Sequence, residues 1–423
     1  MRSAIDRAIG LLARLLVRGF FQRCEITHAA QLRSRGPRVI VANHFNGFVD
    51  VVVLVAALGR LPRFVAKATL GRVVGLRLVL RVLGVVLVQR RQDGEGTAGN
   101  TDAFAACTQR LQRGDTIVIF PEGTTHDREE LVELRTGAAR IAMGAAAAGV
   151  DVTVVPVGLT FGDKARIRND VLVDPGPPIR VPVVGVDDHE AVDRLTADIN
   201  TALGALVPGV ADPIEAWAFD RAAEIALRCA AEPEPTLARR RPTARTYARA
   251  EPELRADLLR ALGDYTVALD LNRLGDREVS STGRVLTVRA VVLAIVTWLA
   301  LPFLATLAVV NATPILLVLA VDLVVSVPVS KGTTRTLIGL IAFPTSWIIA
   351  ASIAVDGAWP VTGLVVAQAV GLVAALWLLH QDAALVQSTI RRHSAHVRSA
   401  RMPSLAERRR AVVTAARAIS DAR

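Results

Sequence analysis

A long apolar stretch near the C-terminus limits the possible folds of this chain more than any other feature. Residues 285–380 are almost continuously apolar, whereas residues 1–280 carry most of the charge. Hydrophobic residues make up 52% of the 423 residues, and the mean hydropathy of +0.40 is high for a soluble protein. We therefore predict a globular part followed by a membrane part.

The apolar stretch divides at turn-forming residues into four candidate membrane spans, at about 286–309, 313–329, 335–354 and 360–380. The second span is near the shortest length that crosses a ~30 Å hydrocarbon core. The loop at 311–313 has no positive charge and the third loop has only Asp356, whereas Lys331 and Arg335 lie in the second loop. The positive-inside rule then predicts a multi-pass protein of the cytoplasmic membrane, with its N-terminal part and C-terminal tail in the cytoplasm. Two hairpins that do not fully cross are the alternative.

The C-terminal tail, residues 381–423, is basic. Residues 385–423 contain nine arginines and two acidic residues, and the whole chain has a net charge of +11. A basic tail beside membrane spans is typical of contact with anionic lipid head groups. With only 4% aromatic residues and no nucleic-acid-binding module, we expect no nucleic-acid partner.

The cysteines and the N-terminal residues indicate in which cellular compartment the protein folds. Cys24, Cys107 and Cys229 have no metal-ligand spacing and are interpreted as reduced thiols, and we expect no metal and no cofactor. Residues 1–22 predict an amphipathic helix, and its arginines argue against a cleavable signal peptide. This helix is either an in-plane membrane anchor or a helix packed on its own domain.

Strands and helices alternate through residues 23–185, which predicts an α/β domain with a mixed sheet flanked by helices. The expected strands are 38–42, 64–67, 85–88, 116–120 and 152–159. Residues 186–280 are expected to form a helical extension, with breaks around 208–213 and 233–242. An α-helical transmembrane bundle is expected to follow.

Two motifs at strand ends carry the chemistry. His44 follows the strand 38–42 and precedes Asp50 by six positions, while Glu122 and Gly123 follow the strand 116–120. An imidazole paired with a carboxylate, beside a backbone-lined pocket, can deprotonate an alcohol. For an isolated His–Asp pair, a structural histidine at a strand end would be the more common interpretation.

The sequence resembles the glycerolipid acyltransferase superfamily at four motifs in order. They are Asn-His-Phe-Asn-Gly-Phe-Val-Asp at 43–50, Gly-Val-Val-Leu-Val-Gln-Arg at 84–90, Phe-Pro-Glu-Gly-Thr-Thr-His-Asp at 120–127 and Val-Pro-Val-Gly-Leu at 155–159. The resemblance covers much of residues 1–180. It is closest to the branch that acylates glycerol 3-phosphate or dihydroxyacetone phosphate, because members of that branch often have five residues between His and Asp.

The resemblance implies roles for individual residues. His44 would be the general base and Asp50 would fix its tautomer, while Arg90 would bind the acceptor phosphate, with Arg91 as the alternative. The residues expected at the acceptor are Glu122, Gly123 and Thr124, and those expected to shape the pocket are Asn46, Pro121 and Pro156. Relatives often differ at Thr124 and Thr125, so these residues would tune the pocket.

Other polar residues are weaker candidates. Further cations that could bind phosphate or coenzyme A, but are individually more typical of solvated surface, are Lys67, Arg135, Arg166 and Arg168. His126 and Asp127 are interpreted as loop scaffolding. Asp322 lies near the middle of the second span, where we expect a partner within the bundle rather than an ion site.

These residues together predict a membrane-bound O-acyltransferase of phospholipid biosynthesis. The donor would be acyl-CoA or acyl carrier protein, and the acceptor would be glycerol 3-phosphate. One alternative is an enzyme that acylates lysophosphatidate or another lysophospholipid. The others are a non-catalytic membrane scaffold and a small transporter. The sequence leaves the donor, the acyl-chain preference and the oligomeric state open.

Overall fold

The computed structural model describes residues 2–67, 84–88, 100–126, 128–162, 169–228, 232, 234–272, 274–276, 279, 285–325, 328–355, 357, 360–368, 370–372, 375 and 402–422. The chain divides into two compact units. The first unit comprises residues 1–17, 23–161 and 170–211, and the second comprises residues 18–22, 162–169 and 212–423.

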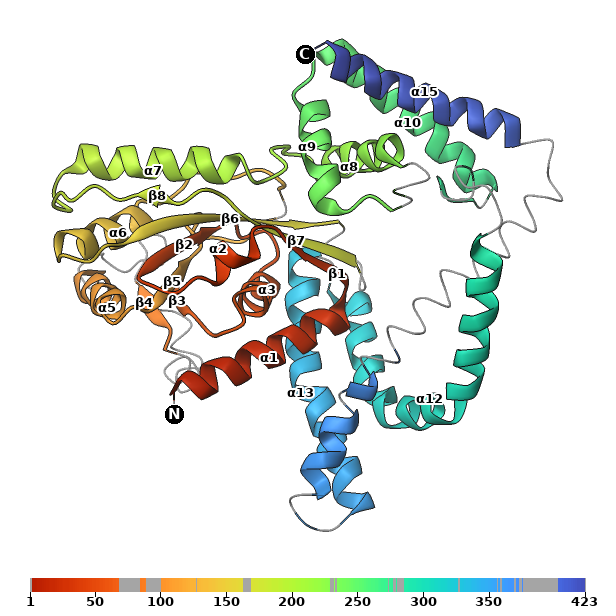
Figure 1. Cartoon of the computed structure of the whole chain (residues 1–423), viewed down its shortest axis with the longest axis horizontal. Coiled ribbons are helices and arrows are strands. Elements are labelled where there is room, and N and C mark those ends of the chain that lie inside the picture. The colour runs from red at the N-terminus through yellow and green to blue at the C-terminus, as the bar shows by residue number, and fades with distance from the viewer. Residues whose placement is uncertain are drawn as a thin grey trace. The chain divides into compact units, whose positions relative to one another are not determined.

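The first unit is built on one mixed eight-stranded sheet (Figure 1). Its strands are β1 (Phe21–Ile26), β2 (Arg38–Ala42), β3 (Arg63–Lys67), β4 (Val86–Val88), β5 (Thr116–Ile119), β6 (Thr153–Phe161), β7 (Asn169–Pro175) and β8 (Ile179–Arg180). The order is β1-β7-β6-β2-β5-β3-β4, and β8 pairs with β6. Strands β2 to β6 pair in parallel, whereas β7 and β8 run antiparallel to β6. The predicted mixed α/β sheet is therefore confirmed.

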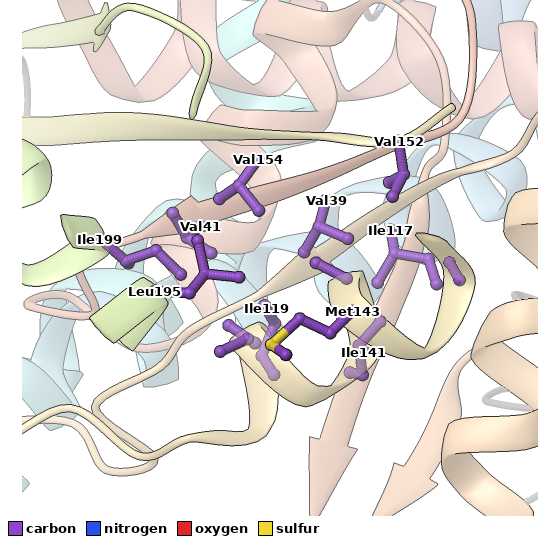
Figure 2. Close-up of a cluster of buried hydrophobic side chains, with 14 of the residues drawn as sticks. Val39, Val41, Ile117, Ile119, Ile141, Met143, Val152, Val154, Leu195 and Ile199 are labelled. Atoms are coloured by element: carbon purple, nitrogen blue, oxygen red, sulfur yellow. The ribbon is translucent and has the colours of Figure 1, made fainter. Parts of the chain in front are cut away.

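The core of this unit forms where alternate residues of the central strands meet the helices. Val39 of β2 is in register with Ile117 of β5 and with Val154 of β6, so these three side chains share one face of the sheet. Figure 2 shows them packed against Met143 and Leu195 from two helices. All five residues are at most 2% exposed. Because β2 is buried on both faces, its continuous apolar sequence fits a central parallel strand.

Three helices supply the packing on this face: α5 (Asn100–Gln112), α6 (Gly137–Ala147) and α7 (His189–Gly204). Helices α2 (Ala29–Arg33) and α3 (Phe48–Leu58) lie on the other side of the sheet from α7 (Figure 1). The domain boundary expected after residue 185 would place α7 in the helical extension rather than in the sheet domain. Because Leu195 and Ile199 of α7 are buried in the sheet's core, α7 belongs to the first unit, which continues to Ala211.

Helix α1 (Arg2–Phe20) packs on its own domain through small and polar residues. Gly10 lies so close to Gly59 that an added Cβ would be 2.4 Å from the Gly59 carbonyl carbon. Asp6 also forms an ion pair with Arg63, and its carbonyl accepts the Leu61 N–H. The exposed side chains of this helix include Ile5, Leu11 and Leu12. One face of α1 is thus occupied, and an apolar flank stays open.

The second unit contains four packed helices: α8 (Pro213–Leu227), α9 (Leu237–Ala248), α10 (Pro252–Asn272) and α15 (Met402–Asp421). Helix α15 packs on α8 and α10 and buries Leu405, Val412 and Ile419. Much of the predicted basic tail is therefore an ordered helix. Pro242 was expected within a break but lies inside α9, which begins at Leu237.

The apolar region differs from the expected division. Helix α12 (Val285–Val324) is continuous through 311–313, where a loop was predicted, and α13 (Pro328–Ala354) begins before the predicted third span. Asn311 stays helical because it is fully buried and its side-chain oxygen accepts the Trp347 Nε1–H at 2.8 Å. Within the described residues one helical segment, Leu337–Ala354, is long and apolar enough to cross a membrane. Shorter apolar helical segments are Ala308–Val321 and Pro360–Leu372.

Gly158 gives a test of the packing beneath the site. A Cβ at this position in β6 would lie 2.7 Å from the backbone oxygen of Leu206. We expect Gly158→Ala to destabilise the protein by about 1–3 kcal/mol, because the backbone must shift to admit a methyl group. Thermal unfolding of the detergent-purified protein measures this.

The matched control is Gly263→Ala, in the helix α10, where an added Cβ meets nothing within 4 Å. The control should be neutral or stabilising by up to about 1 kcal/mol, since alanine favours helices. Equal melting temperatures for wild type and Gly158→Ala would contradict the packing argument.

Candidate active site

The candidate site lies at the carboxyl-terminal edge of the parallel strands. His44 follows β2 by two residues and Glu122 follows β5 by three. Since β2 and β5 are parallel neighbours in register, their carboxyl ends meet at one edge of the sheet. In open α/β sheets this edge is the usual place for ligands. The sheet topology thus brings together two motifs that are seventy-eight positions apart.

His44 and Asp50 form the predicted pair. The Nδ1 atom of His44 is 2.9 Å from Oδ2 of Asp50, which is completely buried. An ionised carboxylate only accepts hydrogen bonds, so Nδ1 carries the proton and Nε2 keeps its lone pair. The His44 side chain is 19% exposed, so part of the ring is accessible from outside.

The turn between the pair explains the five-residue spacing. Gly47 precedes α3 with φ 57° and ψ −128°, a conformation that suits glycine only. It allows Asp50, in the first turn of α3, to accept the Asn46 N–H at 2.9 Å. A carboxylate in the first turn of a helix is also stabilised by the helix dipole. Five residues therefore fit between His44 and Asp50 without separating the imidazole from the carboxylate.

An aromatic stack fixes the plane of the imidazole. The His44 ring lies 4.0 Å from the Phe120 ring, centroid to centroid, with 14° between their planes. Phe120 in turn stacks on Phe64 at 6.4 Å. The His44 imidazole is thus held on one side by an aromatic face and on its edge by Asp50. Sequence reasoning assigned no role to Phe120, although it stands next to Pro121 in the third motif.

Glu122 is an internal anchor. Its carboxylate is buried and accepts the His44 backbone N–H at 2.7 Å through Oε1. Its second oxygen accepts the Val132 N–H at 3.2 Å and lies 2.6 Å from Nε2 of His126. Both oxygens therefore have partners inside the protein. The interpretation of His126 as scaffolding agrees with this contact.

The neighbouring residues of the third motif form the turn over this anchor. Pro121 is buried and its carbonyl accepts the Arg135 N–H at 2.8 Å. Gly123 has φ 68°, and Arg135 Cγ lies 3.6 Å from the position of its missing Cβ. Thr124 is exposed. The turn thus places Gly123, Thr124 and an exposed arginine side by side.

A residue that sequence reasoning left without a role holds β2 to β6. The Asn43 side chain is fully buried, donates to the Leu159 carbonyl at 2.9 Å and accepts the Leu159 N–H at 2.7 Å. Pro156 lies deeper in the sheet, in register with Val41, and its carbonyl accepts the Gly176 N–H. Asn46 is 3% exposed beside Asp50. Pro156 therefore lies in the sheet beside Val41, and Val41 precedes His44 by three residues.

Several predicted residues lie outside the described part of the chain: Arg90, Arg91, Asp127, Arg166, Arg168 and Cys229. Lys67 ends β3, next to β4 in the sheet. Asp322 is helical within α12. Among the described residues no group of three or more His, Cys, Asp or Glu side chains could hold a metal ion.

Comparison with known proteins was consistent with this geometry. Residues 23–160 match the family model described as Acyltransferase. A segment of 120 residues is 31% identical to glycerol-3-phosphate O-acyltransferase 2 of Saccharomyces cerevisiae, covering 27% of this chain and 16% of that protein. A segment of 113 residues is 33% identical to lysophospholipid acyltransferase LPEAT1 of Arabidopsis thaliana, covering 26% of this chain and 28% of that protein. The chain thus matches less than a third of either relative.

Among solved structures, the 1-acyl-sn-glycerophosphate (LPA) acyltransferase PlsC from Thermotoga maritima aligns with 48% of this chain and 80% of that chain. Its TM-score of 0.38 and identity of 17% are too low to support a conclusion about this chain. The family model and the ordered motifs agree on the same segment. Residues 23–160 of this chain are therefore similar to the acyltransferase family.

Proposed function

We propose that this protein transfers a fatty acyl group from a thioester donor, acyl-CoA or acyl carrier protein, to a hydroxyl group of glycerol 3-phosphate. The observation that carries the proposal is the His44–Asp50 pair at the open edge of the acyltransferase-family domain. Its free imidazole nitrogen is the group that an alcohol substrate requires.

The geometry supports a direct transfer. Nε2 of His44 takes the proton of the acceptor hydroxyl as the hydroxyl oxygen attacks the thioester carbonyl carbon. The tetrahedral intermediate then collapses, the carbon–sulfur bond breaks, and the leaving thiolate takes the proton back from the imidazolium. Asp50 stabilises the positive charge on His44 between these steps. No bond between enzyme and acyl group is formed.

The contacts of Glu122 favour a positioning role over a substrate contact. Its two oxygens accept from His44 and Val132 and lie against His126. The acceptor phosphate would instead meet Gly123 and Thr124, with a guanidinium nearby. Arg135, whose aliphatic stem lies next to Gly123, is a described residue in position for this role, and Arg90 is the motif residue proposed for it.

Glycerol 3-phosphate is our first acceptor, because of the five-residue spacing in the first motif and because one relative is named a glycerol-3-phosphate O-acyltransferase. A lysophospholipid acceptor is the second candidate. It is favoured by the similarity to LPEAT1, which is named a lysophospholipid acyltransferase.

We further propose that the protein spans the membrane with both ends of its apolar region on the cytoplasmic side. Helix α15 follows this region yet packs on α8 and α10, which precede it. Buried Asp276 joins them, since it forms an ion pair with Arg228 and accepts from Tyr265 and from Arg409 of α15. Helices that share one polar network lie on one side of a bilayer, so the number of crossings would be even.

The first prediction concerns the base and its partner. His44→Ala should lower the acyl-transfer rate by ~10²–10⁴-fold, because the general base is lost. Asp50→Asn should lower it by ~10²-fold or more, since the tautomer and the imidazolium lose their support. Labelled palmitoyl-CoA with glycerol 3-phosphate or lysophosphatidate, added to membranes, measures both variants.

The matched control is His189→Ala, which removes an exposed imidazole from the same unit. Full activity of His44→Ala with every donor and acceptor would contradict the proposed mechanism. If product formed only from lysophosphatidate, the second acceptor candidate would take first place.

The second prediction separates positioning from acceptor binding at Glu122. Glu122→Gln leaves one buried N–H group without an acceptor, at a cost of about 1–3 kcal/mol. We expect a lower melting temperature and a lower kcat, with the KM for the acceptor within about twofold of wild type. Steady-state kinetics and thermal unfolding give the three quantities.

Glu133→Gln makes the same change at an exposed carboxylate and should leave all three quantities unchanged. A Glu122→Gln protein that keeps its kcat and melting temperature but has a KM raised tenfold would show that Glu122 binds the acceptor instead.

The third prediction concerns the even number of crossings. In a cysteine-free background, single cysteines at Asp264 of α10 and Thr414 of α15, both exposed, should react with an impermeant maleimide from the same side of sealed membrane vesicles. Labelling of the two positions from opposite sides would rule out the shared bundle. Extraction of the protein from membranes by alkaline carbonate would contradict the membrane proposal, whatever the labelling result.

A further inference from the structure

A polar cavity lies at the edge of the sheet opposite to His44. It has a volume of about 360 Å³ and opens at the first residues of β3 and β5. Helix α1, the turn after α2, and the loops before β3 and β5 all contribute to it. Its charged lining residues are Asp6, Arg7, Arg35, Arg60, Arg63 and Asp115. Nothing in the proposed acyl transfer uses this cavity.

The two acidic residues of the cavity are already paired. Asp6 lies 3.0 Å from Nη2 of Arg63, which is only 4% exposed. Asp115 lies 3.4 Å from Nε of Arg63 and 3.7 Å from Nη1 of Arg110. Both carboxylates are therefore occupied by cations other than Arg35 and Arg60.

Three other arginines, Arg35, Arg38 and Arg60, lie near one another beside the cavity. Arg60 donates to the carbonyl of Ser34 at 2.9 Å, and buried Arg38 donates to two backbone carbonyls and to the Ser34 hydroxyl. Within the described part of the chain, no carboxylate lies within 4.0 Å of Arg38, of Arg60 or of the exposed Arg35.

The lowered pKa values of Arg38 and Arg60 show that this arrangement of cations is electrostatically unfavourable. Burial and the nearby Arg35 lower the pKa of Arg60. Burial and the charge of Arg60 lower the pKa of Arg38 to about 10. Adjacent cations with lowered pKa values are stabilised by an anion placed between them.

We propose that this cavity is an anion site that binds a phosphate group through the guanidinium groups of Arg35 and Arg60. A guanidinium fork matches the oxygens of a phosphate and presents two parallel donors to them. The site is separate from the acyl-transfer edge, since it opens at the opposite ends of β3 and β5.

The phosphate could come from a lipid head group or from a soluble phosphate ester. Helix α1, which contributes Asp6 and Arg7 to the cavity, leaves Leu11 and Leu12 exposed at 58% and 48%. Helix α1 is attached beside the cavity, since the Asp6 carbonyl accepts the Leu61 N–H. The experiment below separates the two sources.

The test measures thermal stability of the full-length protein, with inorganic phosphate as the probe at constant ionic strength. Binding to the folded state raises the melting temperature with ligand concentration. We expect phosphate to stabilise wild type and His44→Ala equally, and the apparent Kd for phosphate to rise at least fivefold in Arg35→Gln/Arg60→Gln. The matched control is Arg180→Gln/Arg194→Gln, which removes two exposed arginines from the same unit.

A second arm uses nanodiscs of phosphatidylglycerol or phosphatidylcholine. Stabilisation by phosphatidylglycerol that is lost in Arg35→Gln/Arg60→Gln would identify the lipid head group as the source, and loss of the phosphate effect alone would identify a soluble ester. Should the double variant fail to fold, Arg35→Gln decides, because Arg35 is exposed. Equal responses of wild type and variant to both probes, or a phosphate effect lost in His44→Ala, would overturn the proposal.

Discussion

The buried carboxylate of Glu122 is the interaction on which the candidate site depends. It links the backbone of His44, after β2, to His126 and Val132 in the loop after β5, so two loops converge on one side chain. A buried charge is stable only when its oxygens are satisfied, and here both are. The position of the imidazole therefore depends on Glu122.

The elements that the sequence predicted well are those whose evidence is local. Apolar runs such as 38–42 and 116–120 indicate buried parallel strands, and their registers place His44 and Glu122 at one edge. The pairing of His44 with Asp50 also follows from the motif. The short distance between His44 and Asp50 also requires Gly47, because the positive φ of Gly47 turns the chain. The helix then begins with the Asp50 carboxylate at the edge of the His44 ring.

The elements that sequence reasoning missed depend on contacts between distant residues. An isolated motif does not reveal that both oxygens of Glu122 have internal partners, and its place at the acceptor stays a prediction. The Asn43 amide was overlooked because its partner, Leu159, is more than a hundred positions away. The expected loop at 311–313 is helical because Asn311 meets Trp347 of another helix, and hydropathy does not register such a contact.

The stacking of His44 on Phe120 has a kinetic consequence. With one face covered by an aromatic ring and Nδ1 committed to Asp50, the imidazole has a single nitrogen, Nε2, through which a proton can enter or leave. In the proposed transfer, the same nitrogen would receive the proton from the alcohol and deliver it to the departing sulfur. Because that transfer forms no bond between enzyme and acyl group, donor and acceptor would have to reach this nitrogen together, and turnover would pass through a ternary complex.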